Sequence, residues 1–338
     1  MNENRKALIA VIGLIIIGGL MLVFLPQKDG EPYRKTRLVL DTYVTIAADA
    51  DEPAAKKAVK MAFERMKEID DKLNRYSPKS EISKVNREAP KPVKVSSDTL
   101  GSVKMGLYYS KISKGSFDIT VGPLVSLFDF NKKIVPGKKE VEKAQELVDY
   151  RLVKIDEKKS TIALSKKGMI LDVGAIAKGL AADEAFKVLK KQGVKGGLID
   201  TGSSALAFSS KEGRKWRVGL RHPRQEEVLT VFDVRNKNIS TSGDYQQFFV
   251  KNGRRYHHII DPLTGYPAGG LASVTVISEK SAAQSDIIST AVFAMGKERG
   301  LDFVKSLKST DVVMITTGGR VIATKNVPSK IAKQIKLR

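Results

Sequence analysis

The sequence contains no cysteine and only three histidines in 338 residues. Without a thiol there is no disulfide framework, no thiolate metal site and no cysteine nucleophile. Two of the histidines are adjacent, His257 and His258, and the third is His222. Three imidazoles without a thiolate partner disfavour a zinc site. Cofactor or metal binding by this chain therefore has to rely mainly on carboxylates, hydroxyls, amines and backbone groups.

Acidic residues are few relative to basic ones, 37 Asp and Glu against 59 Lys and Arg, so the formal charge is +22. Nucleic-acid binding would favour basic residues that cluster and alternate with aromatics. Here the lysines are spread along the whole chain, often as isolated pairs such as Lys56-Lys57 and Lys166-Lys167. We therefore expect no nucleic-acid partner, and a generally basic surface that suits the neighbourhood of anionic lipid.

Residues 7–25 contain no charged side chain and follow Arg5 and Lys6. As a helix, these 19 residues would be about 28 Å long, close to the thickness of the hydrocarbon core. No A-x-A cleavage site follows, and no cysteine is present for lipid attachment. We expect residues 1–6 to be a short flank, 7–25 a transmembrane signal anchor and 26–34 a linker, with a cleaved signal peptide as the alternative.

The remainder, residues 35–338, reads as one mixed α+β domain without an internal repeat. Long helical patterns before and after a run of strands disfavour a regular βαβ array. Asn252-Gly253 between two strand patterns predicts a hairpin. The helices that we expect cover 53–73, 98–114, 176–192 and 282–295. The strands that we expect cover 38–47, 161–164, 169–172, 197–200, 216–220, 229–234, 246–250, 256–260, 273–278 and 311–317.

Two segments predict a phosphate and metal site. Leu171–Gly179 reads LDVGAIAKG, and it places Asp172 and Lys178 around a glycine turn between a strand and a helix, where backbone groups are free for phosphate and metal. In DIIST, Asp286 and Thr290 are four residues apart in a helical pattern, so their oxygens share one face. Two hard oxygen ligands on one face suit Mg²⁺.

Each motif alone leaves alternatives open. GAIAKG is neither a P-loop nor GxGxxG, and it also fits an ordinary strand–turn–helix connection. Asp118 either contacts a ligand or caps a turn. His258 is either a general base or part of an exposed strand end. Asp244 follows a polar turn, STSG, that either wraps a ligand or is a plain loop.

In chain order, these segments resemble the ApbE family, the FAD:protein FMN transferases. The resemblance covers residues 35–310, and the order of the segments makes it specific. One departure stands at the first segment, where the family usually has methionine and glycine and this chain has Leu40-Asp41. The matching segments are LDTYVTI (40–46), LNRYSPKSEISKVN (73–86), GSFDITVGPL (115–124), LDVGAIAKGLAAD (171–183), STSGDY (240–245), HHIIDPLTGYP (257–267) and SDIISTAVFAMG (285–296).

The resemblance implies an ApbE-like flavin transferase fold and assigns roles to individual residues. His258 is the candidate catalytic base. The expected metal ligands for Mg²⁺ are the carbonyl of Ala175 and the side chains of Asp286 and Thr290. The residues expected to bind FAD are Leu40, Tyr76, Ser116, Phe117, Asp118, Asp172, Lys178, His258 and Ile260.

The implied reaction is the Mg²⁺-dependent transfer of FMN from FAD to a Ser or Thr hydroxyl of an acceptor redox protein, with release of AMP. Many relatives are lipoproteins, so the membrane anchor here implies an extracytoplasmic catalytic domain. Two alternatives remain at this point. A Mg²⁺-dependent FAD pyrophosphatase would use water in place of the protein hydroxyl, and a non-enzymatic protein would only bind flavin.

Overall fold

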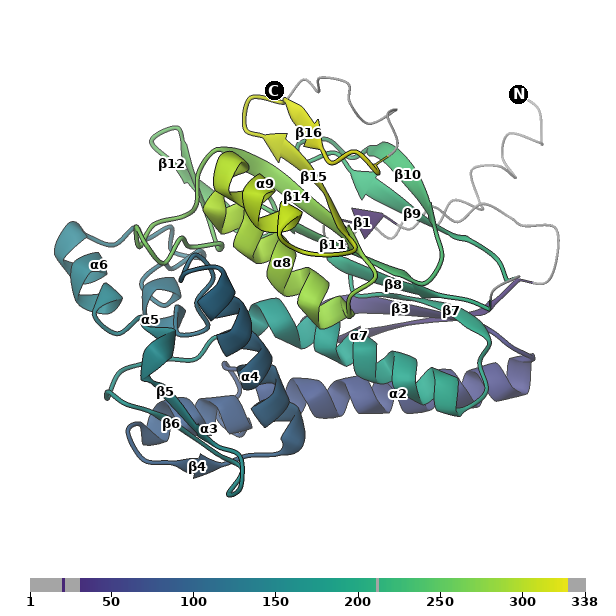
Figure 1. The fold of residues 1–338 in the computed structure, drawn as a ribbon, viewed down its shortest axis with the longest axis horizontal. Helices are drawn as coiled ribbons and strands as arrows, with labels where there is room; N and C mark the ends of the chain where they lie inside the picture. Colours follow the sequence, from purple (N-terminus) through teal and green to yellow (C-terminus); the bar gives the residue numbers. More distant parts are fainter. Residues whose placement is uncertain (1–19, 22–30, 211–212, 328–338) are drawn as a thin grey trace.

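The computed structural model describes residues 20–21, 31–210 and 213–327, and these residues form three layers (Figure 1). An eight-stranded antiparallel sheet is the middle layer. Its strands in spatial order are β16 (Val321–Ala323), β15 (Thr310–Thr316), β14 (Leu271–Ser278), β11 (Lys237–Gly243), β8 (Ser204–Phe208), β7 (Gly196–Asp200), β3 (Thr42–Asp49) and β2 (Tyr33–Val39).

Helices cover one face of this sheet: α2 (Glu52–Leu73), α7 (Gly174–Lys191), α8 (Ala282–Met295) and α9 (Lys297–Lys305). Helix α2 begins where the Asp51 carboxylate accepts the N–H of Ala54 at 3.3 Å, and its apolar residues recur at helical spacing toward the core. Helix α8 begins with a capping box between Ser281 and Gln284 and is buried along almost its whole length. The main hydrophobic core lies between these helices and the sheet.

A small sheet packs on the opposite face and forms the third layer. It consists of β9 (Trp216–Arg221) and β10 (Val228–Val234), joined by the two residues Leu20–Met21, labelled β1. A second apolar cluster fills the space between the two sheets. The Trp216 indole N–H donates to the Phe208 carbonyl at 3.1 Å, which ties the small sheet to the central one.

A lobe of shorter elements lies beside the helices (Figure 1). Arg65 of α2 joins it to the main body, because its guanidinium binds Asp98 of α4 at 2.6 Å and Glu184 of α7 at 2.8 Å. The elements of the lobe are α3 (Glu81–Glu88), β4 (Val93–Lys94), α4 (Ser97–Ile112), α5 (Gly122–Val125), α6 (Lys138–Gln145), the 3₁₀ turn η1 (Tyr150–Leu152), β5 (Val153–Asp156) and β6 (Thr161–Leu164).

A two-stranded hairpin of β12 (Phe248–Lys251) and β13 (Arg254–His257) projects from the body near this lobe (Figure 1). Its turn is Asn252-Gly253, with φ of 52° and 72°. The hairpin predicted from these two residues is therefore confirmed, with β12 and β13 shorter than expected.

Three expectations about strands were wrong. The single strand expected at 38–47 is a hairpin, because Leu40 and Asp41 have φ of 59° and 54° and turn the chain between β2 and β3. Positive φ is the conformation that glycine tolerates best, which accounts for the family's usual glycine at this turn. Residues 169–172 form only an isolated bridge, between Ile170 and Val121. The STSG segment is no loop and instead forms the end of β11, at the centre of the sheet.

The expected membrane anchor, residues 7–25, lies outside the described residues except for Leu20 and Met21. These two pair as β1 with Leu220 and Gly219 of β9. Within the described ranges, no helix combines the length and the apolar character needed to cross a bilayer. At Leu20 and Met21 the structure thus has a strand where we expected a helix. The rest of the anchor lies outside the described residues and stays a prediction from the sequence.

Helices α7 and α8 approach each other most closely at Gly179. A Cβ atom added to Gly179 would lie 2.5 Å from the backbone of Ala282 and Ala283. One turn further along α7, the Asp183 carboxylate accepts the N–H groups of Ala282 and Ala283 at 2.8 and 3.0 Å. These bonds satisfy free donors at the N-terminus of α8, so α7 holds the first turn of α8 in place.

We predict that Gly179→Ala lowers the free energy of unfolding by about 1–3 kcal/mol or more, because the methyl group would overlap backbone atoms that cannot move aside. Denaturant-induced unfolding measures this change. Gly101→Ala is the control, since Gly101 lies in helix α4 and a methyl group added there would meet no atom within 4 Å. It should stabilise the protein by up to about 1 kcal/mol. Equal stability of the two variants would contradict the proposed contact.

Candidate active site

One cavity of about 740 Å³ opens where the lobe, the end of α2, the start of α7, the middle of α8 and the base of the hairpin meet. Every residue that the sequence assigned to the site lines it. They are Leu40, Tyr76, Ser116, Phe117, Asp118, Asp172, Ala175, Lys178, His258, Ile260, Asp286 and Thr290. Segments far apart in the chain thus come together in one place, and their individual roles stay predictions.

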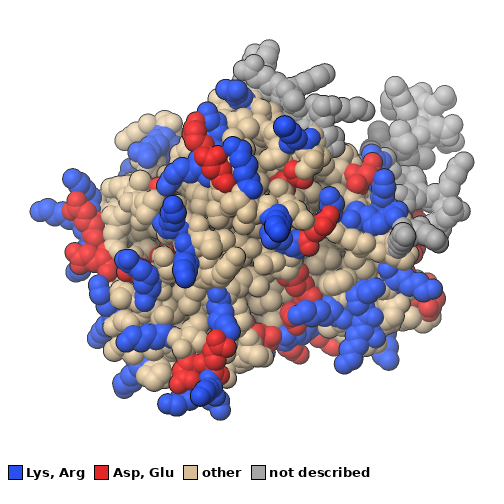
Figure 2. Space-filling model, in the orientation of Figure 1, with Lys and Arg blue, Asp and Glu red and all other residues tan. Residues whose placement is uncertain are grey.

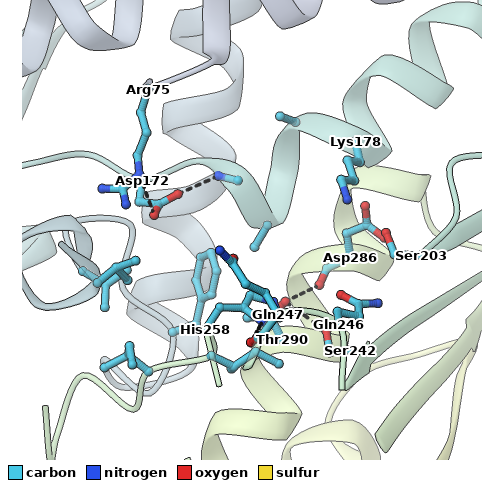
Figure 3. A pocket seen from close by; sticks show the side chains of 18 of the residues that line it. Arg75, Asp172, Lys178, Ser203, Ser242, Gln246, Gln247, His258, Asp286 and Thr290 are labelled. Atoms are coloured by element: carbon cyan, nitrogen blue, oxygen red, sulfur yellow. Dashed lines mark hydrogen bonds and ion pairs between the residues drawn. The ribbon is translucent and has the colours of Figure 1, made fainter. Parts of the chain in front are cut away.

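Arg75 organises one side of the cavity (Figure 3). Its Nε lies 3.2 Å from an oxygen of Asp172, and the other oxygen of Asp172 accepts the N–H of Gly174 at 2.9 Å, at the start of α7. The guanidinium also lies 4.6 Å from the ring centroid of Tyr76 and donates to its hydroxyl at 2.8 Å. Tyr76 is 75% exposed, so one face of its ring is free to stack on a planar ligand.

Ser116, Phe117 and Asp118 form a buried floor below this side of the cavity. One oxygen of Asp118 accepts the N–H and hydroxyl of Thr120 at 2.8 and 2.7 Å, and the other accepts the N–H of Tyr150 at 3.0 Å. Burial raises the pKa of Asp118 above its usual range, against these hydrogen bonds. Asp118 therefore caps a turn and also lines the cavity, and its contact with a ligand stays a prediction.

Lys178 and Asp286 lie on the other side of the cavity (Figure 3). Burial lowers the pKa of Lys178, while the charges of Asp286 and Asp41 act in the opposite direction. Burial raises the pKa of Asp286 to about 6, although the hydroxyls of Ser204 and Ser240 and the charge of Lys178 lower it. Burying the Lys178 ammonium or the Asp286 carboxylate costs free energy, and the opposite charge of the other group offsets part of that cost.

The oxygens expected to bind metal lie along one face of α8. The Thr290 hydroxyl donates to the Asp286 carbonyl at 3.1 Å, and it lies 3.2 Å from the hydroxyl of Ser242 on β11. Ala175, in the first turn of α7, lines the same cavity. Within the described part of the chain, no group of three or more His, Cys, Asp or Glu side chains is arranged for a metal. A metal here would depend on one carboxylate, hydroxyl and carbonyl oxygens, and water or phosphate.

The two adjacent histidines have different environments. His258 Nδ1 lies 3.4 Å from the Gln247 carbonyl, so a proton on Nδ1 leaves the Nε2 lone pair free. The side chain of His258 is half-buried and lines the cavity. Burial and the charges of His257 and Lys178 lower its pKa to about 4. His258 is therefore neutral at physiological pH and available as a base.

The ApbE family model matches residues 40–314. The chain belongs to the ApbE family. A protein of Treponema pallidum named FAD:protein FMN transferase is 30% identical over 322 residues, and the match covers 88% of each chain. Another protein with this name, from Vibrio cholerae, is 28% identical over 325 residues, 93% of this chain and 94% of the relative.

Solved structures of ApbE proteins share the fold. The ApbE protein of Thermotoga maritima superposes with a TM-score of 0.82 at 29% identity, over 87% of this chain and 97% of that one. The flavin transferase ApbE of Vibrio cholerae gives a TM-score of 0.75 at 26% identity, again over 87% and 97%. The α+β, ApbE-like fold expected from the sequence is confirmed for the described residues.

Several polar residues of this ApbE-family site were not assigned from the sequence. Arg75 holds Asp172 and Tyr76, and the Ser204 hydroxyl donates directly to the Asp286 carboxylate. The one signal for Arg75 in the sequence was its position within the matched segment LNRYSPKSEISKVN. Ser204 carried no signal, because its partner lies 82 residues away in the chain.

Two polar residues near the site are held by hydrogen bonds within the protein. Asp244 is buried and held by Arg224 through two bonds of 2.6 Å, so its oxygens are already engaged. His257 is buried as well. Its Nε2–H donates to the Ala268 carbonyl at 2.8 Å, and its Nδ1 accepts the N–H of Ile259 at 3.3 Å. His257 is therefore a structural residue.

We predict that His257→Ala lowers the free energy of unfolding by about 1–3 kcal/mol, because it leaves a buried carbonyl and a buried N–H without partners. Thermal or denaturant unfolding measures the loss. His258→Ala is the matched control on the neighbouring residue, and its effect on stability should be much smaller because its one hydrogen bond is long. If both substitutions cost the same, the structural assignment of His257 is wrong.

Proposed function

We propose that this protein transfers FMN from FAD to a Ser or Thr hydroxyl of an acceptor redox protein, with release of AMP. The observation that carries the proposal is that one cavity combines an exposed aromatic ring, a half-buried lysine, a buried carboxylate and a neutral imidazole. Its volume of about 740 Å³ lies within the range of small-molecule sites, about 300–1,000 Å³. The names of the relatives, FAD:protein FMN transferase, supply the substrate and the reaction class.

In this proposal FAD lies across the cavity. Its flavin ring stacks on Tyr76 at the rim, and Ser116, Phe117 and Asp118 form the floor below it. Leu40 and Ile260, both largely buried, supply apolar contacts. The pyrophosphate lies between the start of α7 and Lys178, where helix N–H groups and an ammonium both favour negative charge.

The chemistry of the donor set fits Mg²⁺. The Asp286 carboxylate, the Thr290 hydroxyl and the Ala175 carbonyl are hard oxygen donors, and Mg²⁺ prefers these with water and phosphate completing its shell. The burial that raises the pKa of Asp286 also makes the carboxylate dependent on a nearby cation for its charge. Bound there, Mg²⁺ would offset the negative charge of the pyrophosphate.

The reaction is a substitution at phosphorus. The acceptor oxygen attacks the phosphorus on the FMN side, a P–O bond forms there, and the P–O bond to the AMP phosphate breaks. His258 takes the hydroxyl proton on Nε2, and AMP leaves with the bridging oxygen. Lys178 stabilises the negative charge that develops on the phosphate oxygens. This electrostatic stabilisation is strongest in a site that excludes water.

Intact-mass measurement of the acceptor tests the proposal. The full chain is incubated with FAD, Mg²⁺ and purified candidate redox proteins that carry a flavinylation motif, and AMP is quantified in parallel. The expected product is an acceptor heavier by one FMN less one water, with one AMP per modified acceptor. Release of free FMN and AMP without modification would show that water is the acceptor, and the protein would be a pyrophosphatase. Unchanged FAD would show binding alone.

We predict that Asp286→Ala reduces transfer by at least about a hundredfold at ordinary Mg²⁺, because the only carboxylate in the expected metal shell is lost. The rate of acceptor labelling measures the change, and unfolding curves establish that the fold is kept. Ser289→Ala is the control, because Ser289 also lies on α8 and lines the cavity but is not an expected ligand. Full activity of Asp286→Ala at low Mg²⁺ would place the metal elsewhere.

We predict that His258→Ala binds FAD with nearly unchanged affinity but loses about 10²–10⁴-fold in transfer rate, since a base acts in the transition state. With a pKa near 4, wild-type His258 stays neutral well below pH 6.5. At saturating Mg²⁺, the wild-type rate should therefore stay level down to about pH 5 and fall below it. An imidazole with the ordinary histidine pKa of about 6.5 would instead give a fall near that pH.

The same experiment has two outcomes that contradict the assignment. An unchanged rate in His258→Ala would show that the base lies elsewhere or belongs to the acceptor. A wild-type rate that falls by half near pH 6.5 would show that His258 titrates normally and is more exposed to water than its surroundings indicate.

We also propose that the catalytic domain is extracytoplasmic and anchored through residues 7–25. The anchor is supported by the uncharged run of 19 residues after Arg5 and Lys6. The orientation is supported mostly by the resemblance to a family with many lipoproteins. Protease treatment of intact spheroplasts distinguishes the two orientations. Degradation of the domain without lysis agrees with the proposal, and protection until lysis overturns it.

A further inference from the structure

The hairpin β12–β13 stands at the mouth of the cavity. Gln246 and Gln247 line the cavity and directly precede β12. His258 lines it as well and directly follows β13. Both ends of the hairpin are therefore cavity residues, and one of them is the candidate base. A macromolecule that delivers a hydroxyl to His258 has to approach this hairpin.

The two faces of the hairpin differ. On one face, Phe249 stacks on Tyr256 with ring centroids 5.3 Å apart and meets Phe130 of the lobe at 5.8 Å, so this face is anchored to the body. On the other face, Phe248 and Val250 are 39% and 51% exposed. The register sets them opposite His257 and Arg255. Two neighbouring apolar side chains are thus left in water beside the site.

The exposed face is held rigidly by charges. The Arg255 guanidinium lies 3.7 Å from the ring centroid of Phe248 and 4.0 Å from a carboxylate oxygen of Asp244. Asp244 is itself fixed by Arg224. Two arginines against one aspartate leave this cluster with a net positive charge, and the cation–π contact presents Phe248 in a defined orientation.

The tip of the hairpin adds to the positive charge. Lys251 and Arg254 are paired directly across the two strands, and both are exposed. Like charges at opposite positions destabilise a hairpin. No acidic residue occurs between Tyr245 and Ile260 in the sequence. Within the ranges that the structure describes, no carboxylate pairs with Lys251 or Arg254.

Elsewhere on the protein, basic side chains commonly have acidic neighbours, unlike those at the tip of the hairpin. Figure 2 shows acidic groups among the basic side chains over much of the visible face. Many lysines of the helices pair with an acid on the same helix, as Lys56 does with Glu52 at 2.7 Å. The hairpin combines cations that have no carboxylate partner among the described residues with exposed apolar side chains, and it does so beside the active site.

We propose that the hairpin, through Phe248, Val250, Lys251, Arg254 and Arg255, is the docking surface for the acceptor protein. The segment that it binds is apolar where it meets Phe248 and Val250, and it carries acidic residues that meet the three cations. Apolar contact supplies affinity, while charge complementarity supplies orientation and speed of association. This inference rests on the proposed function, since only a protein acceptor needs such a surface.

Two substitutions test the surface with the acceptor labelled in the intact-mass experiment. Val250→Asp places a negative charge in the apolar patch, and Lys251→Glu with Arg254→Glu reverses the charge of the tip. Each should raise KM for the acceptor about tenfold or more, with kcat and the affinity for FAD nearly unchanged. Wild-type KM should also rise with salt, and the double variant should lose most of this dependence.

Matched controls lie on helix α2, which Figure 1 shows along the bottom of the molecule, whereas β12 of the hairpin lies at the upper left. Met61→Asp corresponds to Val250→Asp, because Met61 is an exposed apolar residue as well. Lys57→Glu with Lys60→Glu changes the net charge by the same amount as the tip variant. Neither control should alter KM for the acceptor.

The outcomes separate this inference from the function on which it rests. If wild type labels no acceptor, the proposed function fails. If wild type labels the acceptor and both hairpin variants match their controls in KM, the docking surface is wrong and the function stands. The affinity for FAD, measured by flavin fluorescence, shows whether a substitution has distorted the active site. A variant that loses FAD binding is replaced by Val250→Thr, which keeps the strand and removes apolar surface, and an unchanged KM in that variant overturns the proposal.

Discussion

The close approach of α7 to α8 at Gly179 is the constraint on which the site depends. Helix α7 carries Ala175 and Lys178, and α8 carries Asp286 and Thr290. Any side chain at Gly179 would push the two helices apart. The cap that Asp183 forms on α8 fixes the position of the first turn of that helix. Backbone contact and cap together set the spacing between the cavity's ammonium and its carboxylate.

Buried hydroxyls extend this constraint into the sheet. The Ser204 hydroxyl, which donates to Asp286, lies 3.0 Å from that of Ser240, and Thr241 pairs with Thr275 at 2.9 Å. Hydroxyls that satisfy one another can be buried at little cost, whereas unpaired ones cannot. The central strand β11 therefore tolerates a sequence that looks like a polar loop. The same pairs orient the carboxylate that faces the cavity.

The sequence predicted local features better than distant ones. Helix α8 was placed correctly at both ends, because its capping residues and Gly296 lie within the segment itself. The short polar helix α3 and the strands β8 and β11 were missed, since their stability comes from partners far along the chain. The residues of the site were found through the order of the family segments. The pairs Arg75–Asp172 and Arg224–Asp244 were not, because no local pattern encodes contacts between residues from different elements.

The charges of the cavity explain why the site suits an anionic substrate that arrives with a cation. Burial works against the charged forms of both Lys178 and Asp286, as their pKa values show. A pyrophosphate near Lys178 compensates the ammonium, and a divalent cation near Asp286 compensates the carboxylate. Each ligand would offset the free-energy cost of burying one of these two charges. Binding of one ligand should therefore favour binding of the other. FAD and Mg²⁺ bound as proposed would therefore also stabilise the fold, because a ligand that binds only the native state shifts the unfolding equilibrium toward it.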